Sequence, residues 1–193
     1  LPGMRLPQSG KQMLKSLVAA LLVLTVHSAH ADLQKENLLI EIPKDYKLGF
    51  ETKRENMIIA EYVPIDQDVS NWSDMLTAQI FLGLKPPSVK AFQAVGQGML
   101  VKSCQDAKFM DIWQGQENGY AALVWIQLCP HNEKTKRMEL TYLKAIQGND
   151  SLYLVQKAFK VDPPKEDQLK WVNFLKTVLV CDTRASEHPC PKM

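Results

Sequence analysis

The sequence of 193 residues has no hydrophobic run that could cross a membrane as a helix. Its longest apolar stretch, from Leu17 to Val26, has about ten residues, whereas the hydrocarbon core of a bilayer requires roughly twenty helical residues. We therefore expect no stable membrane anchor.

Catalytic and metal-binding signatures are also missing. The sequence contains no Gly-x-Ser-x-Gly and no Cys-x-x-Cys motif. Gly96 and Gly98 lie inside a predicted helix rather than directly after a strand, where a phosphate-binding loop would begin. Cys129 and His131 are too close together for the usual spacing of zinc ligands. We expect no metal and no cofactor.

Histidine is scarce, and only His131 and His188 follow residue 31. Ser103 or Ser151 could pair with either histidine as nucleophile and base, but the spacing of these residues carries no catalytic signature. His188 stands between a glutamate and a proline near the end of the chain, so we predict an exposed loop residue.

Residues 1–31 have the three-part layout of a cleavable secretory signal peptide. Basic residues precede the apolar run, and Ala29 and Ala31 supply the small side chains that signal peptidase accepts before its cleavage point. Cleavage is predicted after Ala31. Residues 32–193 would then form a single domain in the periplasm or outside the cell.

The sequence has no excess of positive charge once residues 1–31 are removed. The full sequence has 23 basic and 21 acidic residues and a net charge of +2. Residues 1–31 contain Arg5, Lys11 and Lys15 and no acid, which leaves 20 basic against 21 acidic residues and a net charge of −1. Lysines and arginines form no cluster typical of nucleic-acid binding, so no nucleic-acid partner is expected.

All four cysteines, Cys104, Cys129, Cys181 and Cys190, follow the predicted cleavage point. An even number of cysteines in an exported chain predicts two disulfides. Three pairings are possible. A local bond between Cys181 and Cys190 would clip the polar tail, residues 181–193, and Cys104 would then pair with Cys129.

The first half of the domain is predicted to begin with a β-meander of three short strands, over residues 38–42, 46–52 and 57–63. Residues 76–82 fit a helix that Asn71 would cap and also fit a strand, and the two interpretations stay open. A helix is predicted from Ser88 to about Cys104. Because glycine weakens a helix, Gly96 and Gly98 would mark close packing on the sheet.

The second half carries the stronger β pattern. Four antiparallel strands are predicted over residues 108–114, 120–129, 137–146 and 152–161, with Asn118 and Gly119 in a tight turn. A final helix, capped by Asp162, is predicted to end at Val180. The expected fold is therefore α+β, an antiparallel sheet with a helix packed on each face.

This order of elements resembles the PsbP-like α/β/α sandwich. Separately, residues 61–64 (EYVP), 71–75 (NWSDM), 181–184 (CDTR) and 188–191 (HPCP) resemble a family of small exported proteobacterial proteins with no assigned activity. The second resemblance implies export and disulfides, and it assigns no catalytic residue.

Polar residues among apolar ones on the predicted strands are the candidate ligand-binding residues. They are Trp125, Gln127, Glu139, Thr141, Gln156 and Lys157. If several share an uncovered part of a sheet face, they would line a cleft. The alternative is a polar patch whose hydrogen bonds are satisfied under a helix. Trp72 is similarly either a core residue or a recognition aromatic.

The missing catalytic signatures and the predicted export favour a non-enzymatic binding or accessory protein, with a protein partner or a small ligand. Two alternatives stay open. One is a small secreted hydrolase or lyase with a sheet-face site at Gln127, Glu139 and Lys157, and the other is a subunit of an envelope assembly.

Overall fold

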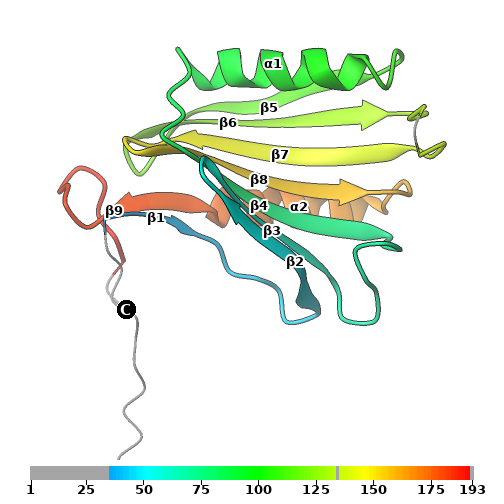
Figure 1. Cartoon of the computed structure of the whole chain (residues 1–193), viewed down its shortest axis with the longest axis horizontal. Helices are drawn as coiled ribbons and strands as arrows, with labels where there is room; N and C mark the ends of the chain where they lie inside the picture. Colours follow the sequence, from blue (N-terminus) through cyan, green and yellow to red (C-terminus); the bar gives the residue numbers. More distant parts are fainter. Residues whose placement is uncertain (1–34, 134, 192–193) are drawn as a thin grey trace, which may run out of the picture. The chain divides into compact units, whose positions relative to one another are not determined.

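The computed structural model describes residues 35–133 and 135–191, and within these the chain forms nine strands and two helices (Figure 1). The predicted signal peptide lies outside the described residues. The strands are β1 (Glu36–Leu39), β2 (Tyr46–Arg54), β3 (Met57–Pro64), β4 (Asp74–Leu82), β5 (Lys108–Glu117), β6 (Tyr120–Cys129), β7 (Glu139–Gln147), β8 (Ser151–Phe159) and β9 (Leu179–Asp182). The helices are α1 (Val89–Val101) and α2 (Lys165–Thr177). The class is α+β with strands dominant, as predicted.

Seven strands form one antiparallel sheet in the order β2-β3-β4-β8-β7-β6-β5, and β1 pairs with β9 in a separate two-stranded sheet. The β5–β6 hairpin turns at Asn118 and Gly119, whose φ angles are 46° and 80°. This is the turn predicted from the sequence, because asparagine and glycine tolerate a positive φ. The four predicted strands of the second half are β5 to β8.

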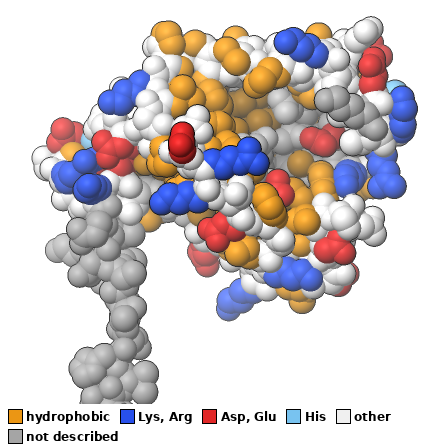
Figure 2. Space-filling model, in the orientation of Figure 1, with side chains coloured by type: hydrophobic (Ala, Val, Ile, Leu, Met, Phe, Trp, Pro, Cys, Tyr) orange, Lys and Arg blue, Asp and Glu red, His pale blue; other side chains and the backbone are white. Residues whose placement is uncertain are grey.

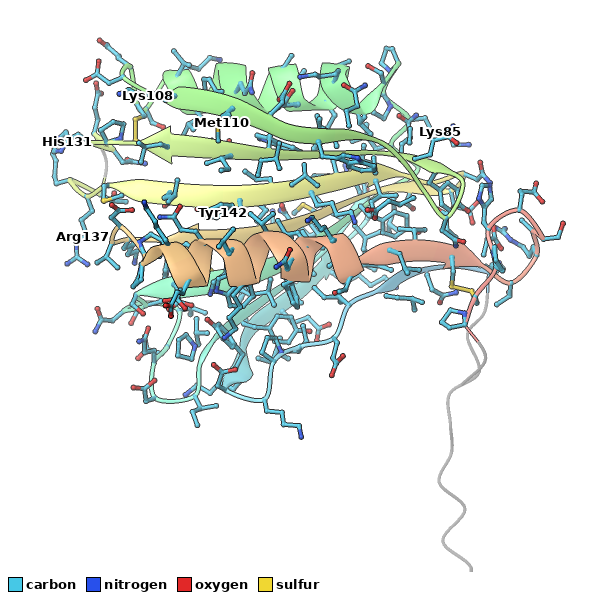
Figure 3. The ribbon with its side chains drawn as sticks, turned by 180° about the vertical axis from the view of Figure 1, so that it is seen from behind. Lys85, Lys108, Met110, His131, Arg137 and Tyr142 are labelled. Carbon is cyan, nitrogen blue, oxygen red and sulfur yellow. A yellow bond between two sulfur atoms is a disulfide. The ribbon has the colours of Figure 1, made fainter. Side chains whose placement is uncertain are left out.

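Successive side chains of a strand point to opposite faces, and in β6 both sets are apolar. Ala122 and Val124 belong to a buried cluster that also contains Trp171 of α2. Leu123 and Trp125 belong to a second cluster, with Val89 of α1. Helix α2 lies behind the sheet in Figure 1 and in front of it in Figure 3, which is seen from the opposite side. We call the sheet face with Ala122 and Val124, which packs against α2, the α2 face. The opposite face, with Leu123 and Trp125, packs against α1 and is called the α1 face.

Residues 74–82 are a strand, so the helical alternative for this segment is wrong. Strand β4 pairs along its whole length with β8, from Asp74 opposite Phe159 to Leu82 opposite Ser151. Asn71 caps no helix. Its backbone N–H instead donates to the side chain of Asp68 in a turn.

The predicted end of the last helix is also wrong. Helix α2 stops at Thr177, because Val178 has an extended backbone (φ −70°, ψ 125°). The following residues form β9 and pair with β1, so the first predicted strand joins the end of the chain instead of a meander. The N-cap of α2 is Pro164 rather than Asp162.

Helix α1 begins as predicted, since the Ser88 hydroxyl accepts a hydrogen bond from the Ala91 backbone N–H at 3.1 Å. The two glycines in this helix do not mark close packing. An added Cβ at Gly96 or Gly98 would meet no atom within 4 Å. The prediction from glycine fails because both residues face open space.

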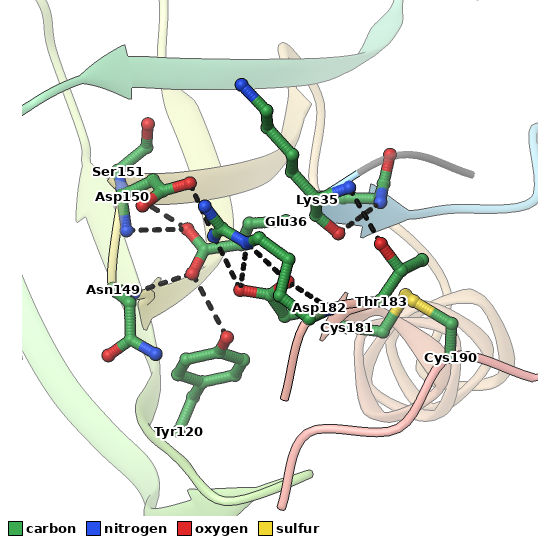
Figure 4. A network of polar contacts seen from close by, with 12 residues as sticks. Lys35, Glu36, Tyr120, Asn149, Asp150, Ser151, Cys181, Asp182, Thr183 and Cys190 are labelled. Atoms are coloured by element: carbon green, nitrogen blue, oxygen red, sulfur yellow. Dashed lines mark hydrogen bonds and ion pairs between the residues drawn. A yellow bond between two sulfur atoms is a disulfide. The ribbon is translucent and has the colours of Figure 1, made fainter. Parts of the chain in front are cut away.

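Both predicted disulfides are present, Cys104–Cys129 and Cys181–Cys190. The second lies beside a polar network that ties β1 to the body of the domain (Figure 4). The Glu36 carboxylate accepts hydrogen bonds from the hydroxyls of Tyr120 and Tyr153 at 3.0 and 2.9 Å. It also accepts three backbone N–H bonds from residues 149–151.

Candidate ligand-binding groove

A groove of about 360 Å³ lies between α1 and the adjoining part of the α1 face. In the space-filling view, hydrophobic side chains gather in a hollow beneath α1 (Figure 2). The groove is lined by Gln79, Phe81, Phe92, Gln93, Val95, Gly96, Gln97, Met99, Trp125, Gln127, Leu143, Leu154 and Gln156. None of these side chains is ionisable. The groove therefore offers apolar walls and amide groups.

The sheet register brings together three of the predicted ligand-binding residues. Trp125 lies opposite Leu143, which lies opposite Gln156, so these side chains stand side by side on the α1 face. Gln127 follows two residues after Trp125 on the same face. All three predicted residues, Trp125, Gln127 and Gln156, line the groove.

Glu139 and Thr141 lie on the α1 face but do not line the groove. Thr141 is opposite Gln127 in the register. It is buried, and its hydroxyl donates to the Glu139 carboxylate at 3.3 Å. Burial raises the pKa of Glu139, although the hydrogen bond from Thr141 opposes this shift. These two residues are hydrogen-bonded to each other, with Thr141 buried and Glu139 half-buried.

Lys157 lies on the α2 face, away from the other candidates. Its side chain is fully buried, pairs with Asp74, and donates a hydrogen bond of 2.6 Å to the Tyr46 hydroxyl. Burial lowers the pKa of Lys157 to about 8, while the hydrogen bond from Lys157 to Asp74 opposes the shift. Since strand alternation separates Lys157 from Gln127 and Glu139, the trio of the hydrolase or lyase alternative is not assembled.

The groove amides differ in what they already bind. Gln156 donates to the Gln79 side-chain oxygen at 2.7 Å, and the Gln93 amide donates to Asp111 outside the groove. Gln127 has no side-chain hydrogen bond to another described residue. The buried Trp125 indole Nε1 also has no partner in the described structure. On the floor of the groove, the free hydrogen-bonding capacity therefore lies on β6, at Trp125 and Gln127.

Among the described residues, no hydrogen bond joins Ser103 or Ser151 to either histidine. The Cys104–Cys129 disulfide and a hydrogen bond from the Glu133 backbone N–H to the Ser103 carbonyl do bring the segments of Ser103 and His131 together. His188 is buried rather than exposed, because its ring stacks on Tyr120 with centroids 3.8 Å apart. Its Nδ1 lies 2.7 Å from the Asn118 carbonyl oxygen. The Ser103 hydroxyl donates to a carbonyl of its own turn, and Ser151 is buried in β8.

Among residues 35–133 and 135–191, no group of three or more histidine, cysteine or acidic side chains is placed to hold a metal ion. Within the same ranges, no helix has the length and apolar character needed to span a bilayer.

Several lining residues were not predicted as site residues. Gln79 was hidden by the ambiguity of β4, although its alternation with apolar neighbours was the available signal. Val95 and Met99 continue the apolar stripe of α1, yet they are 63% and 61% exposed. The stripe extends beyond the part of the sheet that α1 covers, and a stripe alone does not reveal where its cover ends.

No protein-family model matches the chain, and no curated protein matches it significantly. Solved structures with a similar fold include the Ran-binding protein Mog1p of Saccharomyces cerevisiae, at 10% identity over 74% of this chain and 85% of that one, with a TM-score of 0.43. LpqN of Mycobacterium tuberculosis, involved in cell envelope biogenesis, matches at 14% identity over 78% and 87%, with a TM-score of 0.42.

The cyanobacterial PsbP of Synechocystis sp. PCC 6803 matches at 11% identity over 80% of this chain and 97% of that one, with a TM-score of 0.41. A PsbP is thus among the structural neighbours, as the element order led us to expect. At such low identities and scores, no activity or partner is transferred from these proteins.

Proposed function

We propose that this chain is a non-enzymatic binding protein whose groove takes an uncharged ligand with both apolar and amide-like groups. The observation that carries the proposal is the groove lining, which combines Trp125, Gln127 and Gln156 with apolar walls and contains no ionisable side chain. Such a mixture of a mostly apolar surface with a few polar groups is typical of ligand sites. A side-chain amide donates and accepts hydrogen bonds, so it matches a peptide-like amide.

Charged ligands are disfavoured by the same lining. A charge that enters a site with no opposite charge loses its hydration without compensation. Lys90 and Asp111, which do not line the groove, already form an ion pair with each other, and the lining residue Gln93 is hydrogen-bonded to both. The groove should therefore prefer a neutral group over its charged counterpart.

A matched pair of probes tests this preference. N-acetyl-leucine methylamide is neutral, and N-acetyl-leucine carries a carboxylate on the same framework. In NMR titrations, we expect the side-chain amide signals of Gln127 and Gln156 to shift saturably with the neutral probe. The charged probe should bind roughly tenfold more weakly, which corresponds to about 1.4 kcal/mol.

A variant that places a charge in the groove tests the same preference from the side of the protein. Gln127→Glu should weaken binding of the neutral probe, because its carboxylate would lose hydration when the probe covers it. Gln114→Glu on the exposed part of β5 is the control, since Gln114 lies outside the groove. Equal binding of the two probes, or equal loss in the two variants, would contradict the proposal.

We further propose that residues 1–31 are a signal peptide removed after Ala31, and that residues 32–193 work as one domain in the periplasm or outside the cell. The two disulfides support this, because such bonds persist in oxidising compartments. The mass of the exported protein should correspond to an N-terminus at Asp32. Retention of the stretch from Leu17 to Val26 would refute cleavage.

A further inference from the structure

A second hollow lies at one end of the sheet, away from the groove. It is lined by loop residues before β4, by Arg137 before β7, and by Lys160 and Val161 after β8. Trp72, from the Asn-Trp-Ser-Asp-Met stretch at residues 71–75, forms part of its wall. Figure 3 shows Arg137 at this end of the sheet, together with His131 and Lys108.

Two cations converge on the hollow without a carboxylate in contact. In the described structure, neither Arg137 nor Lys160 has an acidic oxygen within 4.0 Å of a side-chain nitrogen. All ion pairs among the described residues have Lys90, Lys144, Lys157 or Arg184 as the cation. Burial lowers the pKa of Lys160, the charge of Arg137 lowers it further, and the charge of Glu139 opposes both effects. The two cations therefore repel each other across the hollow.

The surrounding groups favour an anion. The Lys160 ammonium lies 3.8 Å from the centre of the Trp72 ring, a contact that fixes its position at the wall. Gln67 and Ser73 satisfy each other through hydrogen bonds of 2.7 to 3.2 Å. The exposed Asn71 side-chain amide makes no hydrogen bond to another described residue, so it can donate to a ligand.

We propose that the hollow between Arg137, Lys160 and Trp72 binds an oxyanion, either a carboxylate or a phosphate group of a ligand. An oxyanion between the two cations would remove their repulsion and accept charge-assisted hydrogen bonds from both. The planar guanidinium of arginine matches both kinds of oxyanion. This site is independent of the groove, because the two share no lining residue.

The test is an NMR titration of the exported protein with sodium acetate and with inorganic phosphate, at constant ionic strength maintained with chloride. The Trp72 indole N–H signal, assigned through Trp72→Phe, should move saturably with at least one of the two anions. Tighter binding of phosphate would identify a phosphate site, and tighter binding of acetate would identify a carboxylate site. A shift that chloride alone reproduces, or a shift without saturation, would overturn the proposal.

Variants separate this site from general surface charge. Arg137→Gln and Lys160→Met should each weaken binding about tenfold, since each removes one charge-assisted hydrogen bond. Lys108→Gln is the matched control, because Lys108 is exposed at the same end of the sheet and does not line the hollow. Unchanged backbone signals elsewhere would show that the variants fold. Equal weakening by Lys108→Gln, or none by the first two variants, would refute the assignment.

Discussion

The buried ion pair under α2 gives the sharpest prediction about stability. Lys157 is fully buried, whereas the Asp74 side chain is 19% exposed. Asp74 also accepts hydrogen bonds from the hydroxyls of Tyr46 and Ser73. The two partners should therefore respond differently to removal of the other, since the lysine has no access to water and the aspartate keeps two other donors.

Asp74→Asn should destabilise the protein by about 3 kcal/mol. Removing one partner of a buried pair costs roughly 3 to 5 kcal/mol, because it leaves a buried charge uncompensated. We expect the low end of this range, because Lys157 keeps the Tyr46 hydroxyl and lies 4.1 Å from the Trp171 ring centre. Lys157→Met should cost about 1 kcal/mol or less, since replacing a buried charge by an apolar group of similar length also removes its desolvation penalty.

Urea unfolding of both variants and of the double variant, with the disulfides intact, measures these differences. The double variant should resemble Lys157→Met, because Asp74→Asn is harmful only while the lysine is present. If Lys157→Met destabilises the protein as much as Asp74→Asn does, the reasoning from burial is wrong. The reasoning would also be wrong if the destabilisation of the double variant equalled the sum of the two single variants.

The pH dependence provides an independent check with a defined sign. Burial lowers the pKa of Lys157 from 10.5 to about 8, so the unfolded state binds more protons between these values and stability rises with pH there. Asp74→Asn removes a contact that raises this pKa, which moves the start of the rise below 8. The deficit of Asp74→Asn should therefore be larger at about pH 6 than at about pH 9. A deficit that grows with pH would contradict this sign.

Two other stability predictions come from the glycines and from Glu36. Gly98→Ala should stabilise the protein by roughly 0.5 to 1 kcal/mol in urea unfolding, because the added methyl meets only open space in α1. Gly119→Ala should destabilise it, because Gly119 has a φ of 80° and the added Cβ would lie 2.6 Å from His188 Nδ1. Glu36→Gln should cost roughly 2 to 3 kcal/mol by the same measurement, since an amide NH₂ would replace one carboxylate oxygen that accepts charge-assisted hydrogen bonds. If Glu36→Gln left the stability unchanged, water would be accepting hydrogen bonds from these donors in place of the lost oxygen.

The second half of the fold was predictable because its signals are local. Asn118 and Gly119 specify a tight turn, and this turn sets the register of the strands on either side of it. The presence of two disulfides followed from the number of cysteines, and the short segment between Cys181 and Cys190 favoured the observed pairing over the two alternatives. These features depend on neighbours in the sequence, so no knowledge of distant contacts was needed.

The errors lie where distant contacts decide the structure. Leu179 and Val180 were predicted to continue the last helix, but Leu179 to Asp182 instead pair with β1, which stands more than a hundred residues earlier in the chain. Strand β4 likewise gains its identity from β8, because its own residues fit both periodicities. Intrinsic propensity is a weak preference that such pairing overrides.

The groove depends both on local sequence signals and on distant contacts. Strand alternation places Trp125, Gln127 and Gln156 on one face, and this part follows from the sequence once the register is known. The same alternation places Lys157 on the α2 face. Because Gln156 and Lys157 are neighbours in the sequence, they were grouped together, and only the register shows that they lie on opposite faces. The groove itself exists because α1 covers only one side of the α1 face, with Val95 and Met99 reaching past the packed cluster of Val89 and Leu123. Helix length and stripe width do not specify how much of the α1 face the helix covers. The residues of a sheet-face site can therefore be predicted from the sequence, whereas the opening that makes them accessible cannot.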